Sequence, residues 1–374
     1  MFTRLQRVID DAVSNGRIVG IVYLVARDGK VVFASEKGFA DREAGKPVRR
    51  DTIFRLASVT KPFVAISALA MMDKGLIRLD DPVTRYLPYF TPKLADGPAP
   101  AITLRHLITH TSGLSYDYGP DPDFSDGLSD GDFGFEENFT RLAKRPLKFA
   151  PGSKWEYSVA IDVLGAVLAK VAGASLDDVV KHHVTGPLGI KDTSFHIADR
   201  ARLATAYADA TPVAQRMPDR VTLGSDENGY FNFAPTRAFN PKAFQSGGAG
   251  MVGTADGVLA LLEALRKGGA GVLNPETGRA AITNQVGTLD RGVGSEGQRF
   301  GFVSAVIDDA KLANTPQSKG SLLWGGVYGN DWFVDIARGI SVISMSNTAL
   351  EGCNGQFTKD TRDALYADLA GAKV

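Results

Sequence analysis

A serine and a lysine stand three residues apart in the segment FRLASVTKPFVAISALAMM, where Ser58 and Lys61 form the one Ser-x-x-Lys of the chain. Residues three apart lie on the same side of a helix, so the Lys61 amine is expected beside the Ser58 hydroxyl, where it can influence the serine proton. Ser58 stands at the predicted start of a helix that is apolar on nearly all sides and is therefore buried. The free N–H groups at a helix start favour negative charge that develops near the serine. The pattern suits an activated nucleophile, although a capping serine beside a solvated lysine has the same spacing.

The elements that must position this pair alternate from strand to helix and back to strand. After an N-terminal amphipathic helix, two β-rich runs around Asp28-Gly29 predict a hairpin. Apolar residues at helical spacing then predict helices over 59–74, 104–108, 161–171 and 258–267. From Arg299 onward short β-type runs return, before a final helix from about Lys359 to Leu369.

We therefore predict an α+β fold in which both ends of the chain join one antiparallel sheet, flanked by the N- and C-terminal helices. Residues 1–55 and 297–374 would form this lobe, and residues 56–296 an inserted, mostly helical lobe. The active site is expected in the cleft between them. Two irregular stretches, Ser115 to Asn138 and Thr211 to Gly250, are expected to form walls of the pocket.

The Ser-x-x-Lys motif is also the nucleophile motif of penicillin-binding proteins and serine β-lactamases. FRLASVTKPF, followed by LDDPVTRYLP, resembles that superfamily, and especially the family VIII carboxylesterases. Further matching segments follow in order: ITLRHLITHTSGL, FAPGSKWEYSVAIDVLG, PLGIKDTSF, SGGAGMVGTADG and WGGVYGNDWFVD. The resemblance implies a β-lactamase/transpeptidase-like fold, similar to class C β-lactamases, and an acyl-enzyme on Ser58.

The second catalytic element of the superfamily is a tyrosine in Tyr-x-Asn, and the resemblance places it at Tyr157, with Val159 in the Asn position. Literal matches at 230–232 and 328–330 lack the flanking Pro-Gly and Trp-x-Tyr-Ser, so we interpret them as coincidences. A free phenol titrates near pH ~10, so Tyr157 needs a substantial downward pKa shift to act as a base with Lys61.

The third element of the superfamily is a Lys-[Ser/Thr]-Gly strand, and Trp324-Gly325-Gly326 stands at that place here. Tryptophan offers an apolar wall where lysine would bind a substrate carboxylate, so the replacement favours neutral esters over β-lactams. The resemblance makes the Val327 N–H the second oxyanion donor beside that of Ser58. Asp162, five residues after Tyr157, is a candidate for orienting this network, and a surface or capping role fits the sequence equally.

Two other patterns compete with this site. A Gly-x-Ser-x-Gly around Ser129 matches the nucleophile elbow, but no strand precedes it. His106 and His110 share a predicted helix face, but neither a following Glu nor a third metal ligand is evident, so a structural role is predicted.

Composition excludes several classes of function. Forty-two basic and 42 acidic residues give a formal net charge of zero, which does not favour a nucleic-acid partner. One cysteine, Cys353, and five histidines predict no disulfide, no metal site and no cofactor. The N-terminus mixes charges through its apolar positions, and no apolar run approaches the ~18 residues of a membrane span. These features predict a cytoplasmic protein without a membrane partner.

The sequence therefore predicts a serine carboxylesterase that cleaves short-chain acyl esters through an acyl-enzyme, with weak β-lactam hydrolysis as a side activity. Three alternatives stay open: a β-lactamase or D-alanyl peptidase, an acyltransferase, and a non-catalytic binding protein of the same fold. Acyl transfer uses the same acyl-enzyme, so only competition by an acceptor alcohol separates it from hydrolysis.

Overall fold

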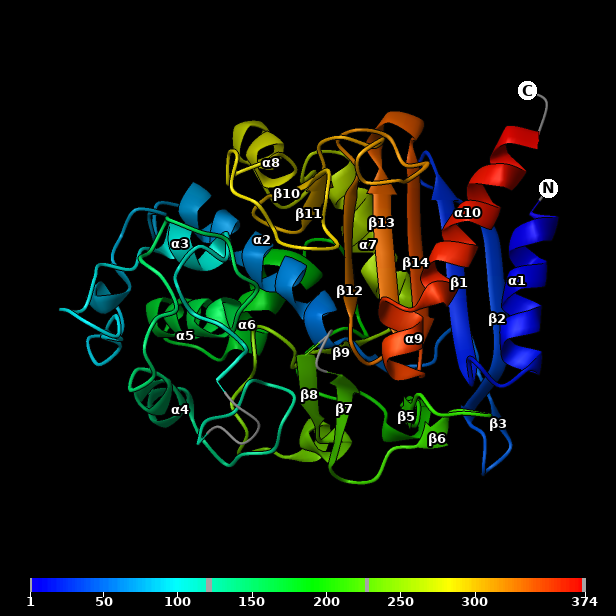
Figure 1. Cartoon of the computed structure of the whole chain (residues 1–374), viewed down its shortest axis with the longest axis horizontal. Coiled ribbons are helices and arrows are strands. Elements are labelled where there is room, and N and C mark those ends of the chain that lie inside the picture. Colours follow the sequence, from blue (N-terminus) through cyan, green and yellow to red (C-terminus); the bar gives the residue numbers. More distant parts are fainter. Residues whose placement is uncertain (1, 119–122, 226–228, 372–374) are drawn as a thin grey trace.

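The structure is a computed structural model that describes residues 2–118, 123–225 and 229–371 (Figure 1). Its α-helices are α1 (Thr3–Ser14), α2 (Thr60–Asp73), α3 (Leu104–Ile108), α4 (Phe135–Leu142), α5 (Ala160–Ala172), α6 (Leu176–Val180), α7 (Ala255–Arg266), α8 (Pro275–Ala281), α9 (Ala349–Cys353) and α10 (Gln356–Gly371). The helices predicted from apolar spacing are present, each within a few residues of its predicted bounds.

Strands from both ends of the chain form one antiparallel sheet in the order β10-β11-β12-β13-β14-β1-β2-β3. Its strands are β1 (Gly20–Arg27), β2 (Lys30–Asp41), β3 (Lys46–Pro47), β10 (Gln298–Phe300), β11 (Ala305–Ile307), β12 (Leu322–Gly326), β13 (Asn330–Asp335) and β14 (Ile340–Ser346). Three small pairs lie outside it: β4 (Phe54–Arg55) with β9 (Val252–Gly253), β5 (Tyr207–Ala208) with β6 (Gln215–Arg216), and β7 (Val221–Ser225) with β8 (Gly229–Phe233). The predicted joining of the two chain ends is confirmed, because β1 pairs with β14.

The central strand β1 is apolar on both faces because helices cover both sides of the sheet. Tyr23 and its alternate neighbours pack with α1 and α10, whereas Val22 and Leu24 face the core that contains α7. Figure 1 shows α10 in front of the sheet and α7 behind it. The predicted hairpin is confirmed: Asp28 and Gly29 have φ angles of 50° and 84°, which is the conformation of a two-residue turn between β1 and β2.

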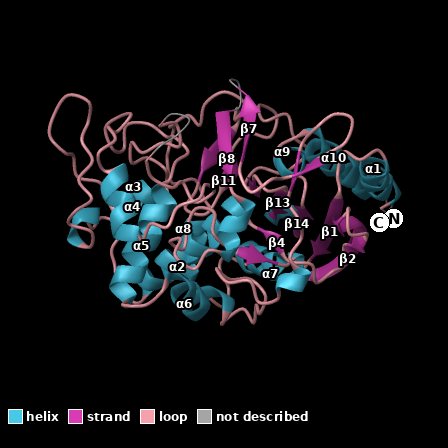
Figure 2. Ribbon diagram, turned by 90° about the horizontal axis from the view of Figure 1, so that it is seen from below, coloured by secondary structure: helices cyan, strands magenta, loops and turns pink. Residues whose placement is uncertain are grey.

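The helices other than α1, α7, α9 and α10 gather beside the sheet around α2, as Figure 2 shows. Helix α2 is buried on all sides and packs against α5, α6 and α8. Helix α7 lies within residues 56–296 but packs against β13, β14 and β1 of the sheet. The predicted lobe boundaries at residues 55 and 296 stay a prediction. No helix in the described part of the chain has the length and apolarity to cross a membrane.

The two stretches expected as irregular loops contain regular structure. Helix α4 begins at Phe135, inside the stretch 115–138, and the stretch 211–250 contains β6, the β7–β8 hairpin and a 3-10 turn, Pro235–Phe239. The prediction missed these elements because Asp, Gly and Pro at their ends outweighed the short apolar runs between them. Parts of both stretches, 119–122 and 226–228, lie outside the described residues.

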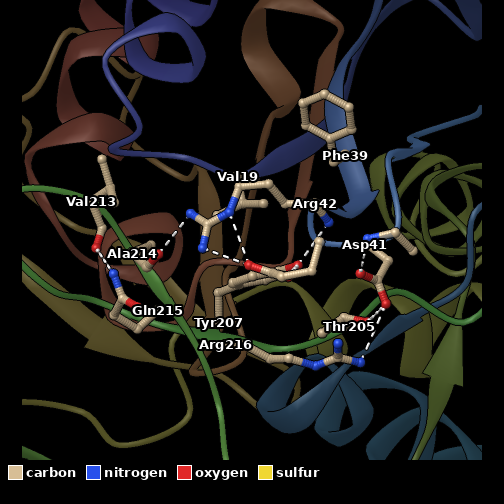
Figure 3. A network of polar contacts seen from close by, with 12 residues as sticks. Val19, Phe39, Asp41, Arg42, Thr205, Tyr207, Val213, Ala214, Gln215 and Arg216 are labelled. Atoms are coloured by element: carbon tan, nitrogen blue, oxygen red, sulfur yellow. Dashed lines mark hydrogen bonds and ion pairs between the residues drawn. The ribbon is translucent and has the colours of Figure 1, made fainter.

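A polar network attaches the β2–β3 end of the sheet to the β5–β6 pair (Figure 3). The Arg42 N–H donates to the Tyr207 hydroxyl at 2.8 Å, and the Arg42 guanidinium donates to the Ala214 carbonyl at 2.8 Å. Asp41 accepts from Arg216 at 3.3 Å. These contacts fix the segment around the β5–β6 pair onto the edge of the sheet.

Candidate active site

Ser58 lies on a short 3-10 turn, Ala57–Val59, that leads directly into α2. Strand β4 precedes this turn, and the Leu56 N–H donates to the Met251 carbonyl at 2.9 Å. Ala57 has a φ of 44°, a conformation that side-chain-bearing residues adopt at a cost of order 1 kcal/mol. Ser58 therefore follows a strained residue, between a strand and a buried helix. Part of its surface is exposed.

Lys61 points back along α2 toward the serine and is only 4% exposed. Its Nζ donates to Ser58 Oγ at 3.1 Å, to the Tyr116 hydroxyl at 3.0 Å and to the Gly248 carbonyl at 2.8 Å. Burial lowers the pKa of Lys61 to about 7, although the nearby Asp162 carboxylate opposes the shift. Lys61 is therefore the group beside Ser58 whose charge changes near neutral pH.

Tyr157 lies on the other side of the nucleophile, and its hydroxyl donates to Ser58 Oγ at 2.7 Å. Lys61 Nζ is 4.6 Å from the centroid of its ring. Burial raises the pKa of Tyr157, and its hydrogen bonds with Ser58 and Trp324 only partly oppose this. The downward shift that a phenolate base requires is absent, so the neutral phenol is the form present near pH 7.

Tyr116 completes this group of side chains and was missed by the sequence reasoning. Its hydroxyl accepts from Lys61, and its ring centroid is 5.2 Å from that of Tyr157. Burial raises its pKa well above the usual value. The residue lies in the irregular stretch 115–138, where no spacing rule relates a side chain to Ser58.

Asp162 is buried inside the protein, which excludes the surface role that the sequence left open. Its Oδ1 accepts from the Ser246 hydroxyl and, at 3.0 Å, from the Gly248 N–H. The Gly248 carbonyl accepts in turn from Lys61. A Cβ on Gly248 would lie 2.3 Å from Asp162 Oδ2, so this close approach requires glycine. Asp162 is thus connected to Lys61 indirectly, through the backbone of the 246–250 loop.

The end of β12 meets the turn that carries the nucleophile. A Cβ on Gly326 would lie 2.1 Å from the Leu56 carbonyl oxygen, so only glycine permits this approach. The Asn330 amide, at the start of β13, donates to the Arg55 carbonyl at 2.8 Å and to that of Leu56 at 3.3 Å. Asn330, which the sequence reasoning set aside within a coincidental Tyr-x-Asn match, therefore ties this hairpin to the segment before Ser58.

Val327 follows Gly326 and packs in a small apolar cluster with Ala57, the neighbour of Ser58. Within residues 2–118, 123–225 and 229–371, its N–H makes no hydrogen bond. The structure thus brings the Val327 amide beside the nucleophile turn with its donor free. Trp324, three residues earlier, contacts the Tyr157 ring edge-on at a centroid distance of 5.0 Å.

Comparison with known proteins assigns this arrangement to a family. The family model described as Beta-lactamase matches residues 5–364. The chain belongs to the beta-lactamase family. It is 48% identical to Esterase EstB of Burkholderia gladioli, over 97% of this chain and 95% of that protein. The predicted resemblance is thereby confirmed.

Two solved structures share this fold. The structure described as EstCE1, a hydrolase with promiscuous acyltransferase activity, is 44% identical, with a TM-score of 0.90 over 97% of both chains. Simvastatin Synthase (LovD) from Aspergillus terreus is 22% identical, with a TM-score of 0.77 over 98% of both chains, and shows the fold alone. The predicted α+β fold of the β-lactamase/transpeptidase type is confirmed.

Two positions depart from the polar pattern of the wider superfamily. Val159, in the place of its asparagine, is 1% exposed and precedes the first residue of α5. Trp324, in the place of its lysine, packs on Tyr157 and Phe300. The Trp324 side chain therefore places an aromatic ring, and no positive charge, against Tyr157.

The competing patterns have structural explanations. Ser129 lies in an irregular segment, and its hydroxyl donates to Asp126 at 2.9 Å, so the strand–turn–helix context of a nucleophile elbow is absent. The His106 ring accepts from the Thr103 N–H in a capping box at the start of α3. His110 is buried, and desolvation holds its pKa well below the usual value, so its ring is neutral.

Proposed function

We propose that this chain is a serine carboxylesterase that cleaves small carboxylic esters with short acyl chains through an acyl-enzyme on Ser58. One observation carries the proposal: Ser58 Oγ lies within hydrogen-bond distance of both Lys61 Nζ and the Tyr157 hydroxyl. The lysine has a pKa of about 7, which suits a general base at neutral pH. The 48% identity with Esterase EstB supports the same reaction class.

In acylation, the neutral Lys61 amine accepts the Ser58 proton as Oγ attacks the ester carbonyl. The N–H groups of Ser58 and Val327 stabilise the oxyanion. When the tetrahedral intermediate collapses, Tyr157 donates its hydroxyl proton to the departing alkoxide. The proton held by Lys61 then returns to Tyr157 through the Tyr116 hydroxyl, which bonds to Lys61 and lies beside Tyr157. An alcohol leaves and the acyl group stays on Ser58.

Deacylation repeats these transfers in reverse. A water molecule in the place of the departed alcohol loses its proton to the Lys61–Tyr157 pair and attacks the acyl carbonyl. The second tetrahedral intermediate collapses, and Ser58 Oγ recovers the proton as the carboxylic acid leaves. These steps need only side chains, backbone N–H groups and water.

The side chains next to the nucleophile favour esters over β-lactams. Trp324 contributes an aromatic surface where lysine would bind the carboxylate of a β-lactam. Weak β-lactam hydrolysis as a side activity is consistent with the shared acyl-enzyme chemistry.

Acyl transfer is the second candidate function. EstCE1, described as a hydrolase with promiscuous acyltransferase activity, is 44% identical to this chain. Any alcohol that replaces water at the acyl-enzyme gives a new ester by the same proton transfers. Product analysis with and without an added alcohol measures the partition between acid and ester.

Turnover of p-nitrophenyl butyrate and nitrocefin by wild type, Ser58→Ala and Ser129→Ala tests the proposal. Ser58→Ala should lose about 10³-fold or more of esterase activity, whereas Ser129→Ala should stay within roughly threefold of wild type. Wild type should cleave the ester faster than nitrocefin. Full esterase activity in folded Ser58→Ala would refute the assignment, and faster nitrocefin turnover would indicate a β-lactamase.

The setting of the reaction is predicted from the sequence alone. A cytoplasmic location and the lack of a nucleic-acid partner stay predictions, the latter from the net charge of zero.

A further inference from the structure

The Arg291 guanidinium packs against three aromatic rings next to the proposed active site. Its Cζ atom is 4.8 Å from the centroid of the Trp155 ring, 5.3 Å from that of Trp324 and 5.8 Å from that of Phe300. Trp324 contacts the Tyr157 ring, whose hydroxyl reaches Ser58. The guanidinium is therefore separated from the nucleophile by only two side chains.

The charge of Arg291 has no anionic partner among the residues that the structure describes. Within the described ranges, Arg291 donates one hydrogen bond, from Nη1 to the Gln298 amide oxygen, and has no carboxylate within 4.0 Å. Its Nε is buried without an acceptor. Burial lowers the pKa of Arg291 to about 10, so the side chain is charged at neutral pH. Arg291 is half-buried, and a charge that is partly removed from water is usually paired in proteins, because it otherwise loses hydration without compensation.

The charges of two other half-buried arginines are compensated differently. Burial also lowers the pKa of Arg55 and Arg237. Arg55 donates three hydrogen bonds to backbone carbonyls. The positive charge of Arg237 is stabilised by nearby carboxylates, of which Asp162 has the largest effect. Arg291 has aromatic faces in place of such partners. They attract the cation, but its Nε has no acceptor among the described residues.

We propose that Arg291 forms a subsite for an anionic group, a carboxylate, carried by the ester substrate. The inference rests on the proposed esterase function and narrows its substrate class to esters that bear a free carboxylate some distance from the scissile bond. Trp324 removes the cation that the superfamily places on β12, and Arg291 supplies one from the segment between α8 and β10. A guanidinium binds a carboxylate through two parallel hydrogen bonds, and the flanking rings exclude water from the pair.

Matched ester pairs test the subsite on either side of the scissile bond. For the acyl side, the pair is mono-p-nitrophenyl glutarate and its methyl ester. For the alcohol side, it is 4-carboxyphenyl butyrate and its methyl ester. The kcat/KM of each compound is measured with wild type, Arg291→Met, Arg291→Gln and Arg291→Lys, and the Tm of each variant shows that it is folded. Arg299→Met, eight residues along the chain, is the matched control because its guanidinium bonds, among the described residues, to the Gln298 carbonyl alone.

Arg291→Met and Arg291→Gln should lose roughly 10- to 100-fold in kcat/KM for the carboxylate member of at least one pair. Its methyl ester should change by less than about threefold, and Arg291→Lys should retain part of the preference. Arg299→Met should leave both members unchanged.

Three results would overturn the subsite. An equal loss for both members of a pair would mean that Arg291 only supports the aromatic wall. No loss for either carboxylate ester, or the same selective loss in Arg299→Met, would mean that Arg291 does not contact the anion. If the wild-type protein cleaved none of the four esters, the esterase function itself would be refuted.

Discussion

Lys61 Nζ donates to the Gly248 carbonyl oxygen across 2.8 Å, and this bond constrains which way the lysine can receive a proton. A carbonyl oxygen only accepts, so an N–H must keep pointing at Gly248 in either charge state of the amine. The lone pair of neutral Lys61 is left for the two hydroxyls within reach, those of Ser58 and Tyr116. The hydrogen bond to Gly248 thereby leaves the lone pair of Lys61 able to accept the proton of the Ser58 hydroxyl.

The pH dependence of catalysis should report the charge of Lys61. Burial lowers its pKa to about 7, so the neutral base predominates above that pH and the ammonium below it. We expect kcat/KM for p-nitrophenyl butyrate to rise with pH through an apparent pKa of about 7, by nearly tenfold per unit on the acid side. We call this rise the acid limb of the pH profile. Lys61→Met should remove both the activity and the acid limb. Activity that stays level from about pH 5 to 9 would contradict the role of Lys61 as base.

Replacing Asp162 should shift the acid limb of the same profile. The carboxylate raises the pKa of Lys61, so Asp162→Asn should move the limb to lower pH and also reduce kcat, because the 246–250 loop loses its charged acceptor. Asp335→Asn is the matched control. Asp335 is also fully buried and accepts from Ser318 and Tyr366, so its replacement should lower the Tm and leave the limb unmoved. An unmoved limb in both variants would argue against an influence of Asp162 on Lys61.

Removal of the Asn330 amide should impair catalysis more than it impairs folding. Asn330→Ala frees the Arg55 and Leu56 carbonyls, so the segment before Ser58 is no longer tied to β13. We expect kcat to fall by about 10²-fold with a smaller change in KM, because displacement of the nucleophile affects the transition state most.

Asn347→Ala provides a control of the same chemistry for this change. Asn347 is also buried and donates to two successive carbonyls, those of Phe39 and Ala40. Its Oδ1, like that of Asn330, has no hydrogen-bond partner in the described part of the chain. Both variants should lose about 1–3 kcal/mol of unfolding free energy in urea. If Asn347→Ala lost as much kcat as Asn330→Ala, the effect would be one of general stability.

A methyl group on Gly326 should separate the two proposed oxyanion donors. Gly326→Ala places a Cβ 2.1 Å from the Leu56 carbonyl oxygen, so β12 and Val327 must move away from Ser58. The loss in kcat should approach the roughly 10²–10³-fold that is typical of removing one such donor. Gly134→Ala, where the added Cβ meets nothing within 4 Å, should be close to wild type in steady-state assays.

Local spacing accounts for the features that could be predicted from the sequence. Ser58 and Lys61 meet because three residues span one helical turn, and the β1–β2 hairpin forms because Asp28-Gly29 suits a tight turn. Tyr157 was placed by family resemblance, and the structure brings its hydroxyl to Ser58.

The rest of the site depends on contacts between segments that no spacing rule connects. Tyr116 and Gly248 contact Lys61 from loops. The Asn330 amide donates a hydrogen bond to the carbonyl of Arg55, which lies far earlier in the chain. The pKa shifts of Lys61 and Tyr157 depend on burial, which emerges only when these segments pack together. For the same reason the sequence pointed to a phenolate, whereas burial favours the neutral phenol.

The pairing of β1 with β14 also has a consequence for how the protein is made. Ile21 lies opposite Ser346, so a ribosome must synthesise nearly the whole chain before β1 can find its second neighbour. Until then the β1–β2 hairpin has an open apolar edge, which is prone to pair with other chains. Folding should therefore be slow, with closure of the sheet as a late step, and chaperones that shield exposed strands should raise the yield of active enzyme.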